Sequence, residues 1–596
     1  MKQFLSLIIL FGSSLLWSQD YDNYIGAGNT DGITITSSSA EPNNEASKVI
    51  DGSGLDAAKM EAARFLSQAA WGGDMDAIQD VIDMGFEEWL DDQETKPISS
   101  YYDELDDIWD EIYNVRVSAG EDPDEIFGPF GYHFNYAWFE VLMTKEDELR
   151  QRMAYALSQI LVTSLNSNLV DYLETVPRYY DLLMSHALGN YEDLLYDVSV
   201  NIAMGTYLSH LNNPKEDPAN NIHPDENYAR EIMQLFSIGL YELGIDGEPI
   251  EDLEGDWIPT YDNEDIKQLA KVFTGLGPGD INMYVDWTDE PYFGLGLWGA
   301  DLSVPMIMYQ DWHDTGTKTL LGGSYVIPAG QDGMQDIEDA VAFLFDHDNV
   351  APFISKQLIQ RLIKSNPTPA YVQRVAEIFE DNGSGERGDL FAVAKAILLD
   401  TEARDCVWIQ DESNGKLKEP LLALAQISKS LPVTSENGHH WNNGFDLLWD
   451  AGQYPMWSPS VFNFYRPDHV PNGPILDDDL VAPEFQIFNT LTSVGMLNKI
   501  HSWTLWNSVY YDWEDDELFG NNTGQIDTDW LENTVNDIGV EGFVNELDIL
   551  LTHGELSDQW REEIRTATES FDWGDYYHAT LALYLTMSHP DYMIDK

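Results

Sequence analysis

The 596-residue sequence contains very little cysteine and very little positive charge. Its one cysteine, Cys406, cannot form a disulfide within the chain, so no disulfide framework holds the fold. The chain has 105 Asp and Glu against 30 Lys and Arg, which gives a formal net charge of −75 at pH 7. Such a charge repels nucleic acid and anionic membrane surfaces, and we therefore expect no nucleic-acid partner.

Standard catalytic motifs are also absent. The sequence has no G-x-S-x-G nucleophile turn, no H-E-x-x-H zinc motif and no G-x-x-x-x-G-K-[ST] phosphate loop. The sequence therefore assigns no activity directly, and a function has to be inferred from clusters of polar and aromatic residues.

The first residues predict a secretory signal peptide. Lys2 is followed by an apolar run from Phe4 to Leu16 and then by Ser18. This run is shorter than a membrane-spanning helix needs, and no later stretch is long and apolar enough to cross a bilayer. We expect cleavage near Ser18, no integral membrane segment after signal removal, and a periplasmic or extracellular location.

The remaining pattern predicts a mainly α-helical protein. Residues 19–55, rich in Gly, Ser and Asn, are expected to form an extended N-terminal arm, and residues 56–596 a single large multi-helix domain. The clearest helix is expected over 144–162, with Thr144 as its N-cap. Gly, Pro, Asp and aromatics between about 275 and 330 predict a loop-rich or small β insertion. Further helices are expected at 177–186, 227–240, 265–273, 336–345, 352–363, 370–379, 390–398 and 576–587.

The most distinctive polar motif runs from His223 to Glu231 and opens a predicted helix. At 100° per residue one helical face carries Glu226, Asn227, Arg230 and Glu231. In one interpretation this face is solvated and stabilised by pairs between residues four apart. In the other it is a catalytic face in a cleft, with an acid as general base or cation ligand and Arg230 orienting it.

This motif resembles the signature of a bacterial family. The core P-x-E-N-Y-A-R-E over residues 224–231, followed by an apolar run, is similar to the family catalogued as domain of unknown function 1800. Other similar blocks occur in the same order at 26–32, 64–69, 149–159, 186–191, 313–318, 459–463 and 588–592. The resemblance covers nearly the whole mature chain and implies an exported bacterial protein, but it supplies no catalytic residues.

A second polar cluster lies in the predicted insertion, where His313 and Asp314 precede a Gly turn and Lys318. An imidazole beside a carboxylate can bind a divalent metal or serve acid–base chemistry. Neighbouring side chains in an extended segment point apart, however, so a turn held by hydrogen bonds from Asp314 is the alternative.

Two further features suggest ligand contacts. Lys356, Arg361 and Lys364 stand out because cations are scarce, and either they pair with local acids or they bind an anion. The aromatic loop Trp457–Tyr465 could stack sugar rings or other planar ligands in a cleft, with ordinary loop packing as the alternative.

Two functional hypotheses follow. The first is an exported, metal-assisted hydrolase of the cell envelope or extracellular space, which requires the Glu226–Glu231 face and His313–Asp314 to converge in one pocket. The second is a noncatalytic envelope binding or assembly protein that contacts an envelope protein or a glycan through its aromatic loops.

Overall fold

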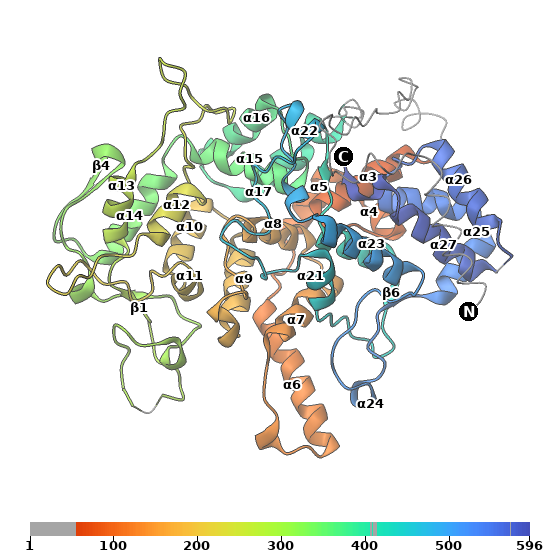
Figure 1. The fold of residues 1–596 in the computed structure, drawn as a ribbon, viewed down its shortest axis with the longest axis horizontal. Coiled ribbons are helices and arrows are strands. Elements are labelled where there is room, and N and C mark those ends of the chain that lie inside the picture. The colour runs from red at the N-terminus through yellow and green to blue at the C-terminus, as the bar shows by residue number, and fades with distance from the viewer. Residues whose placement is uncertain (1–54, 286, 406–407, 409–413, 573) are drawn as a thin grey trace, which may run out of the picture.

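The computed structural model describes residues 55–285, 287–405, 408, 414–572 and 574–596. Helices dominate this part of the chain, and each described strand has only two or three residues (Figure 1). The predicted mainly α fold is therefore confirmed. The predicted signal peptide, and the predicted arm up to residue 54, lie outside the described residues. No described helix is both long and apolar enough to cross a bilayer.

One end of the molecule joins the beginning and the end of the described chain (Figure 1). The long helix α25 packs along α27 and also contacts α3 and α26. The first of these helices, α3, begins after Asp56, whose carboxylate accepts a hydrogen bond from the Ala58 N–H. The helices at this end are α3 (Ala57–Ala69), α4 (Met75–Met84), α25 (Thr528–Thr552), α26 (Asp558–Glu569) and α27 (Asp575–Met587).

The centre contains α8 (Glu148–Ser158), whose residues from Leu149 to Ser158 are all buried. The predicted start of this helix is wrong. Thr144 ends the preceding helix, α7 (Gly131–Thr144), where its hydroxyl donates to the Glu140 carbonyl at 2.8 Å. Other central helices are α5 (Phe86–Glu94), α15 (Val350–Leu362), α16 (Pro369–Glu380), α17 (Leu390–Leu399), α18 (Thr401–Arg404), α20 (Pro420–Ser430), α21 (Phe445–Ala451), α22 (Pro474–Asp477) and α23 (Thr490–Thr504).

The other end carries the predicted insertion as two small antiparallel ribbons. Strand β1 (Leu276–Gly277) pairs with β2 (Ile307–Met308), and β3 (Lys318–Leu320) pairs with β4 (Tyr325–Ile327). The helices here are α9 (Thr175–His186), α10 (Tyr191–Val200), α11 (Ile202–Tyr207), α12 (Asn227–Gln234), α13 (Asn263–Val272) and α14 (Gly333–Phe345).

Helix α12 is shorter than predicted: it ends at Gln234, and the chain makes a left-handed turn at Gly239 where the prediction had helix up to Leu240. Gly239 has a φ of 70°, and a Cβ there would lie 2.9 Å from the Phe353 ring. Only glycine fits this left-handed turn against α15 without strain. The early end of α12 brings the following loop over α15.

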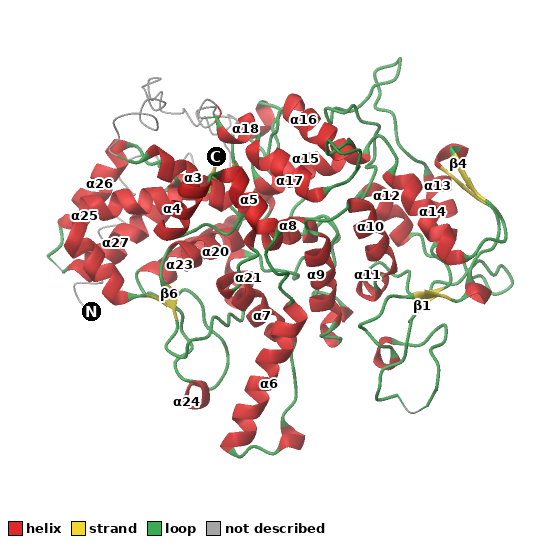
Figure 2. Cartoon of the chain, turned by 180° about the vertical axis from the view of Figure 1, so that it is seen from behind, coloured by secondary structure: helices red, strands yellow, loops and turns green. Residues whose placement is uncertain are grey.

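Helix α6 (Tyr101–Ala119) projects from the body (Figure 1, Figure 2). A short helix, α24 (Asp516–Phe519), contacts it. Two further strand pairs join distant segments: β5 (Lys416–Leu417) with β8 (Ile594–Asp595), and β6 (Val433–Thr434) with β7 (Gln525–Ile526).

A contiguous cluster of buried apolar side chains extends from Met60 to Tyr592. The scarce cations are used inside it: ten of the Lys and Arg side chains in the described part of the chain are buried. They are Arg64, Arg150, Arg152, Lys318, Arg361, Lys364, Lys416, Lys418, Lys499 and Arg561. Burying a cation costs free energy unless an acceptor or a carboxylate pairs with it. A buried Lys or Arg without such a partner is therefore a candidate ligand contact.

Candidate functional site: an apolar cleft around Arg361

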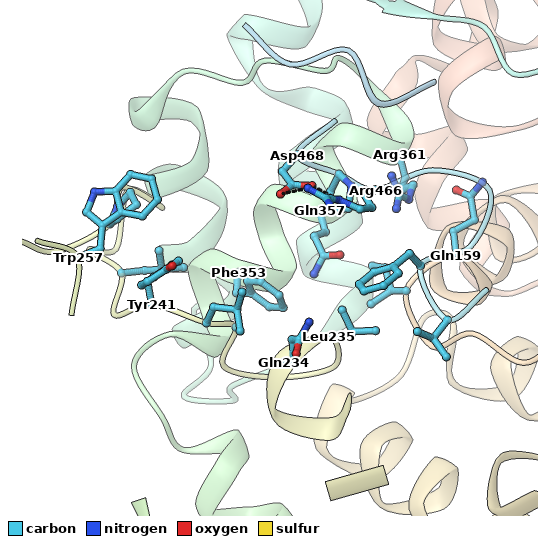
Figure 3. Close-up of a pocket in the computed structure, with 18 residues that line it drawn as sticks. Gln159, Gln234, Leu235, Tyr241, Trp257, Phe353, Gln357, Arg361, Arg466 and Asp468 are labelled. Carbon is cyan, nitrogen blue, oxygen red and sulfur yellow. Dashed lines mark hydrogen bonds and ion pairs between the residues drawn. The ribbon is translucent and has the colours of Figure 1, made fainter. Parts of the chain in front are cut away.

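A cleft of about 410 Å³ opens where four segments meet (Figure 3). These segments are the end of α8, the loop that follows α12, the helix α15 and the loop 461–468. The volume is sufficient for a small organic ligand. Its lining comprises Gln159, Ile160, Gln234, Leu235, Gly239, Leu240, Tyr241, Leu243, Pro249, Trp257, Phe353, Gln357, Arg361, Val461, Phe462, Arg466, Pro467 and Asp468.

Most of the cleft wall is apolar. Phe353 from α15 and Phe462 from the aromatic loop both line it. Trp257 stands at the far side with 53% of its surface exposed, and its ring lies edge-on to Tyr241 at a centroid distance of 5.1 Å. Exposed aromatic faces beside an apolar hollow favour a planar or apolar ligand body.

A cation lies at the inner end of the cleft. Arg361 is only 1% exposed, and its Cζ lies 4.6 Å from the centroid of the Tyr465 ring. Its Nε and Nη1 have no hydrogen-bond partner, and no carboxylate oxygen of the described residues lies within 4.0 Å of the guanidinium. Both nitrogens are themselves buried, so an anionic group would accept hydrogen bonds from them only after neighbouring side chains move.

Two glutamines supplement this cation. Gln357, one helical turn before Arg361, has a buried Nε2 without a partner, and Gln159 has a buried Oε1 without one. At the mouth, Arg466 binds Asp468 in a bidentate pair, with both N–O distances at 2.9 Å (Figure 3). The mouth pair is exposed and neutral overall. Arg361 is the lining cation without an ion pair within 4.0 Å among the described residues, although the buried Glu484 carboxylate interacts with it at longer range.

Behind the cleft, Glu419 is fully buried in a polar network. Its carboxylate accepts hydrogen bonds from Tyr155, Gln159, Gln453 and Tyr465. Burial alone would raise the pKa of Glu419, but the Lys416 ammonium and these hydrogen bonds outweigh it, so the pKa is lowered. Glu419 is therefore an ionised anchor that fixes Gln159 and Tyr465 beside the cleft.

The lining contains few groups that commonly serve in acid–base or nucleophilic catalysis. Among the described residues that line the cleft there is no Ser, Thr, Cys, His, Lys or Glu. Its one carboxylate, Asp468, is paired with Arg466. The polar side chains of the lining are therefore Gln159, Gln234, Tyr241, Gln357, Arg361 and the Arg466–Asp468 pair.

The predicted Glu226–Glu231 face is divided by the structure. Arg230 lies 3.7 Å from Glu226, and both side chains are about two-fifths exposed, as the solvated interpretation predicts. The amide of Asn227 contacts Ser209 instead of Glu231. Glu231 itself is 7% exposed, with a buried Oε2 that has no partner, and burial raises its pKa.

His313 and Asp314 also have separate roles. The fully buried His313 ring contacts the Thr274 carbonyl through Nδ1 at 2.7 Å, and through Nε2 it contacts Asp336 and Lys318 at 3.0 Å each. Asp314 instead accepts the Gly316 N–H at 2.8 Å and holds the turn. Both ring nitrogens of His313 are occupied, so a metal could bind only by displacing a partner.

The structure does not bring these six predicted residues into the cleft, and none of them lines it. The two motifs approach one another only through an intervening segment, where Asn213 accepts the Asp225 N–H and Lys215 donates to the Trp312 carbonyl. Within the described part of the chain, no group of three or more His, Cys, Asp or Glu could hold a metal ion. The hydrolase hypothesis requires the two motifs to converge in one pocket, and neither motif contributes to the cleft around Arg361.

Two other sequence features do meet at the cleft. Arg361 was marked by the scarcity of cations, and the aromatic loop contributes Val461 and Phe462. By contrast, Lys364 pairs with Glu402 at 2.9 Å, as the simpler interpretation expects. The contributions of Gln159 and Gln357 carried no sequence signal, because single glutamines are common and only the packing brings them together.

The chain is a mainly helical protein with an apolar cleft that has Arg361 at its inner end. The model of the family described as protein of unknown function (DUF1800) matches residues 64–594, and the chain belongs to this family. Neither the curated proteins nor the solved structures gave a match.

Proposed function

We propose that the protein is a noncatalytic binding protein for an anionic ligand with a planar or apolar body, held in the cleft around Arg361. The observation that carries this proposal is the buried guanidinium with two unpartnered nitrogens at the end of an apolar cleft. A buried charge without a close counter-ion is costly, and a ligand carboxylate, sulfate or phosphate would offset that cost.

The rest of the cleft supports the same ligand class. Phe353, Phe462 and Trp257 offer apolar and aromatic surface for the ligand body. The net charge of −75 repels anions at long range, so affinity for one must come from local contacts. Recognition of an anion therefore depends on Arg361, because the electrostatic field of the whole protein opposes it.

Export supports an envelope or extracellular ligand. The signal peptide that we propose for residues 1–18 would direct the mature protein to the periplasm or outside the cell. In that setting we propose an acidic envelope component, such as an anionic glycan, as the ligand.

The proposal is tested with two fluorescent probes that share their aromatic rings. Anilinonaphthalene sulfonate carries a negative charge, and phenylnaphthylamine is its neutral counterpart. We expect saturable binding of the sulfonate, and Arg361→Met should weaken it by about tenfold or more, because a charge-assisted hydrogen bond is lost. Binding of the neutral probe should change by less than about twofold.

The matched control is Arg565→Met. Arg565 lies on α26 and pairs at the surface with Glu562 and Glu569, away from the cleft. Near-ultraviolet circular dichroism shows whether each variant is folded. Phe462→Ala is a second cleft variant, at a residue that is 39% exposed. Equal loss of both probes in folded Arg361→Met, or no loss of either, would overturn the proposal.

A further inference from the structure

A second cleft, of about 380 Å³, lies beside the projecting helix α6. It is bounded by α6, by the segment Gly128–Pro129, by the turn η3 (Asn168–Asp171) with the residues that follow it, and by η4 (Leu297–Gly299) with Asn282 and Leu302. Its lining comprises Tyr102, Leu105, Asp106, Trp109, Gly128, Pro129, Asp171, Tyr172, Leu173, Glu174, Asn282, Leu297, Trp298 and Leu302.

Aromatic side chains from three separate segments meet in this second cleft. Trp298 is 76% exposed, and its ring lies edge-on to Tyr172 at a centroid distance of 5.5 Å. Trp109 of α6 lies against Gly128, where a Cβ would come within 2.3 Å of the ring. The chain thus passes close to Trp109 because residue 128 is glycine.

The charged groups of this cleft are all acidic. Asp106, Asp171 and Glu174 line it, and no Lys, Arg or His of the described residues does. Glu174 is partly balanced by Arg178 at 3.3 Å. The side-chain carboxylates of Asp106 and Asp171 have no hydrogen-bond or ion-pair partner within the described part of the chain. Two carboxylates therefore remain free to meet a ligand.

An aromatic face here already holds a cation. The Arg178 guanidinium carbon lies 3.5 Å from the centroid of the Tyr102 ring. The negative face of an aromatic ring attracts cations, and neighbouring carboxylates reinforce this attraction. The faces of Trp298 and Tyr172 have no such cation among the described residues.

We propose that this second cleft binds an organic cation through an alkylammonium group. The aromatic rings of Trp298, Tyr172 and Trp109 contact its carbon atoms, and Asp106 and Asp171 balance its charge. The charge preference is opposite to that of the Arg361 cleft, so this inference stands independently of the proposed function.

Isothermal titration with choline and with dimethylbutanol, its neutral isostere, tests the proposal on the full mature chain. We expect saturable choline binding, with dimethylbutanol about tenfold weaker or undetectable. Trp298→Ala and Asp171→Asn should each lower choline affinity by about fivefold or more, because each removes one attractive contact.

Two surface variants control for general effects. Trp506→Ala removes a tryptophan that is 71% exposed, and Asp529→Asn removes an exposed carboxylate at the start of α25. Both should bind choline like the unchanged protein. The proposal is overturned if choline does not bind below about 10 mM, if the two probes bind equally, or if the control variants lose as much affinity as the cleft variants.

Discussion

The guanidinium of Arg361 lies over the ring of Tyr465, 4.6 Å from its centroid, while the hydroxyl of the same tyrosine donates to Glu419 at 2.8 Å. One side chain thus links the cation of the cleft to the buried anion behind it. Because the ring is held at both its face and its tip, Arg361 is positioned without a direct carboxylate partner.

Tyr465→Phe should separate these two contacts. The ring under Arg361 stays, but Glu419 loses a donor, so the free energy of unfolding should fall by about 1–3 kcal/mol. Binding of anilinonaphthalene sulfonate should change by less than about twofold. Tyr155→Phe, which removes another donor to Glu419, is the matched variant and should destabilise similarly in urea unfolding. Unchanged stability in both variants would argue against the network.

Lys416 balances two buried carboxylates, since its Nζ lies 3.9 Å from Glu419 and 3.6 Å from Glu484. Lys416→Met leaves both acids without this cation and should cost about 3–5 kcal/mol of stability. Burial raises the pKa of Glu484. Adding Glu484→Gln should therefore recover part of the loss, which denaturant unfolding of the single and double variants would measure. Strict additivity would show that the charges are not coupled.

The buried carboxyl group of Glu140 should make the stability of the protein depend on pH. Burial raises the pKa of Glu140 to about 7, although its carboxylate accepts the His440 N–H at 2.7 Å. Between its unfolded pKa and this value the native state binds more protons, so stability should fall as pH rises from about 4.5 to about 7. Glu140→Gln should raise the melting temperature at pH 8 and have little effect at pH 5. A gain of the same size at both pH values would contradict this assignment.

Ionic strength should affect the two clefts in opposite directions. Raising salt from about 0.02 M to about 0.3 M screens the net charge of −75, which repels anions and attracts cations. Choline affinity should therefore fall, while the affinity for anilinonaphthalene sulfonate should hold or rise. Titrations of the same sample at both salt concentrations would check this. If both affinities changed in the same direction, the electrostatic field of the net charge would not distinguish the two clefts.

The helical composition of the fold was predictable because periodic apolar residues leave little alternative. The helix expected at 390–398 is observed as Leu390–Leu399, and the ribbon at 325–327 lies in the expected insertion. The errors lie at helix ends. Thr144 ends a helix instead of starting one, and the turn at Gly239 depends on its contact with Phe353, which no local pattern records.

The site was predictable only in part. Arg361 was noticeable because a cation is unusual in this sequence, and the aromatic loop because it lacks helical period. The emphasis on His313 came from its neighbours in the chain. Of these Lys318 does contact it, but its other partners, Thr274 and Asp336, are distant in sequence. Sequence adjacency indicates chemistry poorly where long-range packing selects the partners.

The burial of ten cations has a consequence for how this sequence can vary. An outer carboxylate can be exchanged for another polar group at little cost, since it contacts mainly water. An interior Lys or Arg, by contrast, is joined to particular carbonyls and acids, as Lys416 is to Arg361 and Glu484. Among relatives, we therefore expect exposed Asp and Glu positions to be substituted often and these buried Lys and Arg positions rarely. The buried basic residues would then be the most reliable positions for aligning related sequences.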